Sequence, residues 1–510
     1  MKPRLNKQAV LLFTLFACIA SLAANAQVVL PKLLTGGMVL QRNMPVHIWG
    51  WDTSGKDVSV EFRGETKSAI AGEMGYWEVY LSPGSAGGPF TLTVHGSSTV
   101  KLNDVLVGDV WVASGQSNME MPLNGFGPEA PIKDAEKEIA AANYPQIRFI
   151  TVTKASSEYP LEDIQSDFPW QACSPRNAGT LSAAAYFFAR DLQAVEKVPI
   201  GLIVSSWGGT WAESWTSMRT LASDPALSPL LASWERSIRD RVDDLRRTAK
   251  EDAEAQKSGK PAPFRFNIYA LRPAGLFNGM IAPLTPLRIK GVIWYQGESD
   301  AGHEEIDALY ARLFPAMITD WREAWGEGDF PFLFVQLSAF GPSAAGPRSV
   351  VREAQRRTLS IANTAMVVSA DVGDPKNIHP PDKQTIGARL ALAARAIAHG
   401  DPIEYSGPLF QQASLEPGAI RAWFDHAKVL VAHGELSGFE VAGSDHIFSP
   451  ASAWIEGTTV VAKSPSVPKP VYLRYAWAAS STITLFNQDG LPASTFNSDR
   501  AYAEQSQSTK

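Results

Sequence analysis

The chain has 510 residues, of which 45% are hydrophobic and 19% charged, and its formal net charge is −6. This balance excludes a disordered chain, and the length predicts two or three domains, one of them large. With 46 basic residues against 52 acidic ones, the chain offers no basic field for a phosphate backbone, so nucleic acid is not an expected partner.

Residues 1–26 are typical of a secretory signal peptide. They combine a basic start, an apolar stretch and a small-x-small sequence that ends at Ala26. The apolar run is shorter than the ~20 residues that a membrane span needs. We expect cleavage near Ala26 and a product that is secreted or periplasmic, with no membrane span.

The mature chain divides by pattern into three parts. Residues 27–106 alternate with period two between Gly and Pro turns, which predicts a β-sandwich. Residues 107–401 alternate apolar strands with helical stretches, which predicts a parallel sheet covered by helices on both faces. Within them, 233–260 is a charged helical insertion. Residues 402–499 return to short strands, and 500–510 form a polar, frayed tail.

Three loops that follow predicted strands carry residues that could take part in catalysis. Ser117, in SGQSNMEMPL, is placed to present its hydroxyl at the mouth of the sheet as a nucleophile. Gly208 and Gly209, in SSWGGTW, allow a backbone amide close to a reacting oxygen. Gln296, in WYQGESD, is a candidate amide donor to the same oxyanion, and Glu298 beside it supplies a carboxylate. Each loop alone also fits an ordinary polar turn.

His379 is the best candidate general base among eight histidines. It lies between a predicted strand and helix and is followed by two prolines, which fix the backbone and exclude it from a regular element. The other histidines belong to the flanking β regions, end a helix, or lack a rigid turn.

Taken in order, these loops resemble the sialate O-acetylesterase family, a branch of the SGNH-type serine hydrolases. The resemblance runs from about residue 34 to 400 and is carried by these blocks: MVLQRNMPVHIWGW, VLVGDVWVASGQSNMEMPL, LSAAAYFFARDL, VPIGLIVSSWGGTWAESW, GLFNGMIAPLTPLRIKGVIWYQGESD, FVQLSAF, VREAQRRTL and DVGDPKNIHPPDKQTIGARLALAA. It implies a three-layer α/β/α hydrolase domain flanked by β units, and removal of O-acetyl groups from sugars without a cofactor or metal.

Carried over by residue, the resemblance makes Ser117 the nucleophile and His379 the general base. The oxyanion hole is then formed by the Ser117 amide, a glycine amide of the Gly208–Gly209 pair, and Gln296. The sequence departs from the SGNH pattern at the third member of the triad, because Lys376 stands where an acid commonly precedes the histidine by three residues.

Four groups remain as candidates to orient His379. Asp374 is the first choice, and Asp371, Glu298 or a backbone carbonyl are the alternatives. The candidates for substrate contact are Asn118, Trp207, Glu213, Glu298 and Arg352. For Arg352, a structural ion pair is the leading alternative, and for the tryptophan, core packing.

The substrate class is expected to be an acetylated sugar or oligosaccharide, either a sialic acid or a plant hemicellulose such as xylan or xyloglucan. A noncatalytic carbohydrate-binding protein on the same scaffold is the alternative from another class. A glycosidase needs two facing carboxylates, of which only Glu298 stands out. HExxH, CxxC, GxGxxG and GxSxG are all absent, which argues against zinc, dinucleotides and the nucleophile-elbow lipases.

Overall fold

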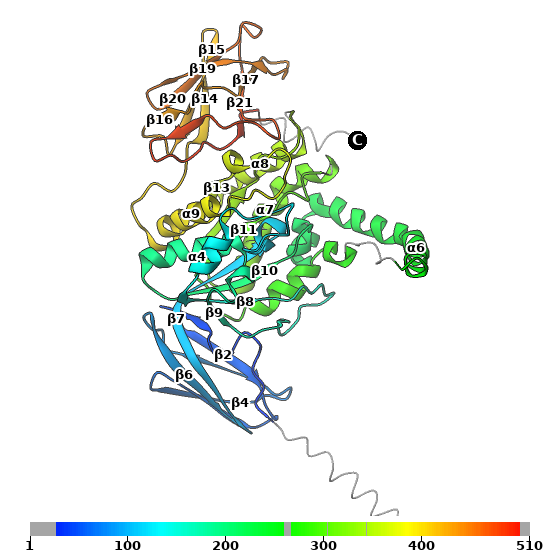
Figure 1. Cartoon of the computed structure of the whole chain (residues 1–510), viewed down its shortest axis with the longest axis vertical. Helices are drawn as coiled ribbons and strands as arrows, with labels where there is room; N and C mark the ends of the chain where they lie inside the picture. The colour runs from blue at the N-terminus through cyan, green and yellow to red at the C-terminus, as the bar shows by residue number, and fades with distance from the viewer. Residues whose placement is uncertain (1–26, 260–266, 303, 343, 500–510) are drawn as a thin grey trace, which may run out of the picture.

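The structure is a computed structural model that describes residues 27–259, 267–302, 304–342 and 344–499. A β region lies at one end, a mixed α/β region occupies the middle, and a second β region lies at the opposite end (Figure 1). The expected signal peptide (1–26) and tail (500–510) fall outside the described residues.

The N-terminal region is built mainly from short antiparallel strands, some of which alternate buried and exposed positions. In β3, for example, Val58, Val60 and Phe62 are buried while their neighbours are more exposed, the pattern of a strand with one face on a core. β3 pairs with β4 and β6, whereas β2 pairs with β5 in a separate sheet. The strands are β1 Val39–Gln41, β2 Val46–Trp51, β3 Asp57–Phe62, β4 Glu65–Ile70, β5 Tyr76–Leu81 and β6 Gly87–His95.

A single 17-residue strand, β7 (Thr99–Gly115), connects this region to the middle of the molecule. Its first half pairs antiparallel with β6, and its second half pairs in parallel with β10 and β11. The boundary expected between residues 106 and 107 therefore falls inside one continuous strand. The two regions share backbone hydrogen bonds along β7 instead of being joined by a linker.

The central sheet has the strand order β13-β12-β11-β7-β10-β8-β9 and is parallel except for the edge strand β9. The predicted parallel α/β fold is thus confirmed. These strands are β8 Tyr144–Thr151, β9 Gln171–Cys173, β10 Ile200–Ser206, β11 Gly291–Tyr295, β12 Phe332–Gln336 and β13 Thr364–Val368.

Helices cover both faces of this sheet. Helices α4 and α9 pack on one face and form one buried cluster with alternate residues of the strands, while α7 packs on the other face in a second cluster. The side chains of Ser182 and Asp382 cap the N-termini of α4 and α9. The helices are α2 Ser117–Glu120, α3 Ala135–Ala141, α4 Ala183–Glu196, α5 Met218–Ser223, α6 Ser228–Lys257, α7 Glu304–Trp325, α8 Pro347–Arg357 and α9 Lys383–Ala394. α6 covers most of the charged stretch expected at 233–260 and extends away from the body of the molecule (Figure 1).

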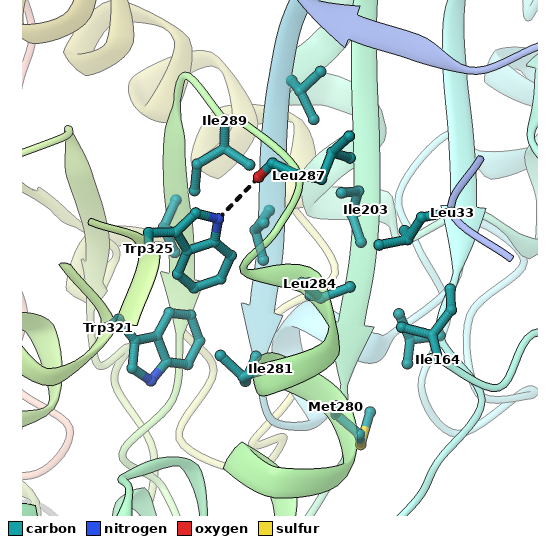
Figure 2. Close-up of a cluster of buried hydrophobic side chains, with 14 of the residues drawn as sticks. Leu33, Ile164, Ile203, Met280, Ile281, Leu284, Leu287, Ile289, Trp321 and Trp325 are labelled. Carbon is teal, nitrogen blue, oxygen red and sulfur yellow. Dashed lines mark hydrogen bonds between the residues drawn. The ribbon is translucent and has the colours of Figure 1, made fainter. Parts of the chain in front are cut away.

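The buried cluster on the α7 face also includes residues of the N-terminal segment. Figure 2 shows Leu33 beside Ile203 of β10, in the same cluster as Trp321 and Trp325 of α7. The indole N–H of Trp325 donates to the carbonyl of Leu287 at 3.1 Å, so the large ring is buried without leaving its polar atom unpaired.

The C-terminal region packs two four-stranded antiparallel sheets, β14-β15-β20-β19 and β18-β17-β21-β23, around its own core, with a two-stranded pair β16-β22. The expected C-terminal β unit is confirmed. Its strands are β14 Leu409–Glu416, β15 Ala419–Asp425, β16 Leu430–Ala432, β17 Phe439–Ala442, β18 Ser449–Pro450, β19 Ser452–Glu456, β20 Thr459–Lys463, β21 Tyr472–Tyr475, β22 Leu485–Asn487 and β23 Phe496–Asn497.

Candidate active site

Ser117 is presented by a tight turn at the carboxyl end of β7. Gly115 has φ +132°, and a Cβ on it would lie 2.2 Å from the carbonyl oxygen of Tyr295, so only glycine fits here. The side chain of Gln116 then accepts the N–H groups of Gly297 and Ser299, both at 3.2 Å. The turn is thereby joined to the loop after β11, and Ser117 opens the short helix α2.

His379 comes from the loop between β13 and α9, and its Nε2 lies 2.9 Å from the Oγ of Ser117. The loop is shaped locally, because the side chain of Asn377 accepts the His379 N–H at 2.9 Å. Two groups 262 residues apart in the chain therefore meet at hydrogen-bond distance, as the proposed nucleophile and base require.

The environment of His379 favours its neutral, proton-accepting form. Burial lowers the pKa of the imidazole below its ordinary value, the positive charge of Lys383 lowers it further, and the negative charge of Glu120 opposes them. The edge of the Phe126 ring packs against the imidazole, with 5.4 Å between ring centroids.

None of the three carboxylates considered for the triad contacts His379. The carboxylate of Asp374 accepts the backbone N–H of Lys376 at 2.8 Å within its own turn. Asp371 forms a bidentate ion pair with Arg389 at 2.7 Å, and Glu298 accepts a hydrogen bond from Asn118. The expectation of Asp374 as third member is corrected, because in the described part of the chain the ring of His379 hydrogen-bonds only Ser117.

The Gly208 loop does approach the nucleophile, but its amide is already in use. A Cβ on Gly208 would lie 3.1 Å from the Cβ of Ser117, so the absence of a side chain permits this contact. The Gly208 N–H donates to the carboxylate of Glu120 at 2.5 Å, and Glu120 also pairs with Lys154 at 2.6 Å. The Gly208 amide is therefore not a free oxyanion donor in this structure. The amides of Ser117 and Gly209 have no acceptor among the described residues.

Gln296 differs from the expectation as well. Its carboxamide is fully buried and donates one N–H to the carbonyl of Thr210 at 3.1 Å and the other to Asp300. Both of its N–H groups are thus committed to the interior, which corrects its assignment as an oxyanion donor. Glu213 lies in the same interior, where burial, and secondarily the nearby Asp300, raise its pKa well above the ordinary value. Glu213 is 1% exposed and does not face a substrate.

Asn118, expected to contact substrate, instead organises the interior behind Ser117. It is fully buried, and its Nδ2 donates to Glu298 and, at 3.1 Å, to the carbonyl of Ile378. Its Oδ1 accepts a hydrogen bond from the Nζ of Lys383 at 2.5 Å. Glu298 is 7% exposed, so it too is an interior group.

Two further candidates for substrate contact are also buried. Arg352 is 1% exposed and donates to the carbonyls of Leu337 and Ser338 at 2.8 and 2.7 Å, so it neither meets substrate nor forms the ion pair considered as the alternative. Burial lowers its pKa to about 9. Trp207 is 8% exposed and lies beneath Lys154, whose Nζ is 5.7 Å from a ring centroid.

A cleft of about 610 Å³ begins beside Glu120 and runs between the ends of β8 and β10 and the segment around residues 166–180. It is lined by both charged and apolar side chains. The side chains that give it this character are Glu120, Lys154, Asp167, Phe168 and Arg176. Neither Ser117 nor His379 is among the residues that line this cleft; Glu120, which lines it, accepts the Gly208 N–H beside Ser117.

Two charged residues near the Ser117–His379 pair were not identified from the sequence. Glu120 lies three residues after Ser117, the spacing that places two residues on one side of a helical turn, and this signal was available. Lys383 gave no such signal, because a lysine in the first turn of a helix is usually solvated.

The described residues include no cluster of three or more His, Cys, Asp or Glu side chains arranged to hold a metal ion. Over the same residues, no helix is both long enough and apolar enough to cross a membrane.

Comparison with known proteins places this geometry in a family. Residues 275–396 match the family described as carbohydrate esterase, sialic acid-specific acetylesterase. The chain is 32% identical to mouse sialate O-acetylesterase, over 86% of this chain and 87% of that protein, and 30% identical to the human protein, over 87% and 86%. A crystal structure of a carbohydrate acetylesterase from Xanthomonas citri superimposes with a TM-score of 0.80 at 36% identity, covering 93% of this chain and all of that one.

The fold, the serine–histidine contact and these relatives define a carboxylic ester hydrolase of the carbohydrate esterase class. More particularly, the chain belongs to the sialate O-acetylesterase family.

Proposed function

We propose that this protein removes O-acetyl groups from carbohydrates by serine catalysis through an acetyl-enzyme. The observation that carries the proposal is the 2.9 Å contact between His379 Nε2 and Ser117 Oγ. The alternative of a noncatalytic carbohydrate-binding protein does not account for a nucleophile and a base held at this distance.

In the first half-reaction, His379 accepts the proton of the Ser117 hydroxyl as its oxygen attacks the acetyl carbonyl carbon. The oxyanion that forms is stabilised by the Ser117 amide, with the Gly209 amide as the second donor. Collapse of the tetrahedral intermediate breaks the bond to the sugar oxygen, which takes the proton from His379 and leaves as a hydroxyl group. Water activated by the same imidazole then hydrolyses the acetyl-enzyme and releases acetate.

The cleft beside Glu120 supports a carbohydrate as the alcohol portion of the ester. Its charged end, formed by Lys154 and Glu120, suits hydroxyl groups, and Phe168, which is 66% exposed, offers a ring face for stacking. The names of the relatives favour an acetylated sialic acid as substrate, while acetylated xylan and xyloglucan fragments are the alternatives. Acetate release from a panel of the three decides between them.

The compartment is part of the proposal. The basic start, apolar stretch and Ala-Asn-Ala sequence of residues 1–26 support export with cleavage near Ala26. The N-terminal sequence of the protein recovered from the native host tests this. A chain that begins at Gln27 supports export, and one that retains Met1 in the cytoplasm contradicts it.

Replacing Ser117 by Ala tests the mechanism. We expect S117A to fold as the wild type does and to lose ~10³-fold or more in acetate release, because the nucleophile is absent. The H379A variant is expected to lose a similar factor through loss of the base. Activity with p-nitrophenyl acetate and melting temperature are measured together. An S117A protein with full activity would refute the assignment.

A further inference from the structure

The loop that carries His379 is held to the nucleophile turn by a buried lysine. Lys383 is fully buried, and its Nζ donates to the Oδ1 of Asn118 at 2.5 Å and to the carbonyl of Pro380 at 3.0 Å. Asn118, which follows Ser117 in the chain, donates in turn to the carbonyl of Ile378 at 3.1 Å. The two carbonyls that flank His379 are therefore both bound by the Asn118–Lys383 pair.

The Asn118–Lys383 pair takes the role that the acid has in a Ser-His-acid triad, which is to fix the imidazole relative to the serine. His379 has no carboxylate against its ring in the described part of the chain, so its orientation depends on its backbone and on the ring's contacts with Ser117 and Phe126. Binding the carbonyls on both sides of one residue restricts that backbone strongly. Because Asn118 is the neighbour of Ser117, the same contacts set the distance between the two reacting groups.

Lys383 has around it the partners that a buried ammonium group needs. A buried charge needs partners, and the structure supplies them. Lys383 has two hydrogen-bond acceptors, the face of the Tyr295 ring at 5.4 Å from its Nζ, and the carboxylate of Glu298 as a counter-charge. Every polar atom of the Asn118 side chain is also used.

We infer that Lys383 is a positioning residue for ester hydrolysis, which holds His379 against Ser117 through Asn118 and the Pro380 carbonyl. The inference rests on the proposed roles of Ser117 and His379. It assigns no new contact with substrate, and it replaces the expected acid by a buried cation that acts on the backbone of the base.

The charge of Lys383 can be detected in the pH profile of the reaction, because this charge lowers the pKa of His379. The charged groups that act on His379 are Lys383 of α9, which lowers its pKa, and Glu120 of α2, which raises it. The charged group that acts on Lys383 is Glu298, after β11, and Glu298 also interacts with Arg348 of α8. Burial lowers the pKa of Lys383 to about 7, so it is cationic over the more acidic range in which His379 titrates.

The test uses the full-length protein with Lys383 replaced by Met, which keeps the length of the side chain and removes its donors and charge. We expect kcat to fall ~10- to 100-fold with KM within about twofold, since the geometry of the base is disturbed and substrate binding is not. We also expect the acid limb of the kcat/KM profile to move to higher pH, because a charge that lowered the His379 pKa is gone. Glu120→Gln should move the same limb to lower pH.

Lys290→Met is the matched control. Lys290 is a partly buried lysine whose pKa, like that of Lys383, is lowered by burial, but it lies at the opposite end of β11, away from Ser117. Its variant should keep the wild-type kcat and acid limb. If K383M folds and shows the profile of K290M, the inference is overturned.

Should K383M fail to fold, Asn118→Ala tests the same contacts from the other side. N118A should lower kcat and leave KM near the wild-type value; an N118A protein with wild-type kcat overturns the inference. The proposed function fails separately, by an active S117A variant. An inactive S117A beside a K383M of wild-type kcat and pH profile would refute only the role of Lys383.

Discussion

At the scale of single residues, the proposed chemistry depends on one side-chain contact between two loops and on the groups that surround this contact. Ser117 and His379 meet at 2.9 Å, yet no carboxylate completes a triad within the described residues. In the proposed mechanism, Glu120 stabilises at longer range the imidazolium that forms during attack, and contacts to its backbone hold it in place. A Ser-His pair can catalyse acyl transfer without an acid bound to the histidine, although it lacks the stabilisation of the imidazolium that such an acid supplies.

Asp374→Asn distinguishes this arrangement from a conventional triad. The asparagine Oδ1 can still accept the Lys376 N–H, so the turn is preserved, and no contact with His379 is lost. We expect kcat/KM within about threefold of the wild-type value, whereas loss of a true triad acid costs ~10⁴-fold. Kinetics with p-nitrophenyl acetate give the answer, and a loss comparable to that of H379A would restore Asp374 to the triad.

At the scale of elements, helix α8 joins the central sheet to the C-terminal β region. The guanidinium of Arg352 donates to the carbonyls of Leu337 and Ser338 on one side and to that of Ala479 on the other. A buried arginine that donates only to carbonyls stabilises three chain segments at once. Arg352 therefore lies in the interior and has neither of the two roles considered for it from the sequence, which were substrate contact and an ion pair.

Arg352→Met tests this connection. The variant removes the donors of several buried carbonyls, each of which costs ~1–3 kcal/mol when left unpaired. We expect the free energy of unfolding to fall by about 2 kcal/mol or more in urea titration. Arg357→Met, on the same helix, is the control, because Arg357 is partly exposed in its ion pair with Glu353 and should change stability by less than ~1 kcal/mol. Equal effects from the two variants would contradict the account.

At the scale of the whole molecule, the sequence predicted the class of fold because hydrophobic periodicity reports burial directly. The six strands of the parallel sheet follow apolar runs, and the flanking regions show period-two alternation. The sequence did not reveal that β7 passes from one region into the other, because periodicity marks strands and not their partners. Which strands pair, and in which register, depends on contacts between segments that are far apart in the sequence.

The candidate site was predicted unevenly for the same reason. Ser117 and His379 were singled out because a turn after a strand and a loop with two prolines leave a local signal, and because the ordered series of loops resembles a known family. The partners of Gln296 and Asp374 were not identifiable, because a side chain that points inward and one that faces a cleft have the same local sequence. Gln296 is bound to Asp300, and Asp374 to the backbone N–H of Lys376; both pairings are known only from the folded chain.

The most direct measurement of the central claim is to locate the acetyl group during turnover. The wild-type protein is mixed with p-nitrophenyl acetate, quenched in acid before the steady state, digested, and mapped by mass spectrometry. The account predicts an acetyl group on Ser117, in the peptide that contains GQSNMEM, and none on the same peptide of the S117A variant. An acetyl group carried by another residue during productive turnover, or S117A that releases acetate at the wild-type rate, would contradict it.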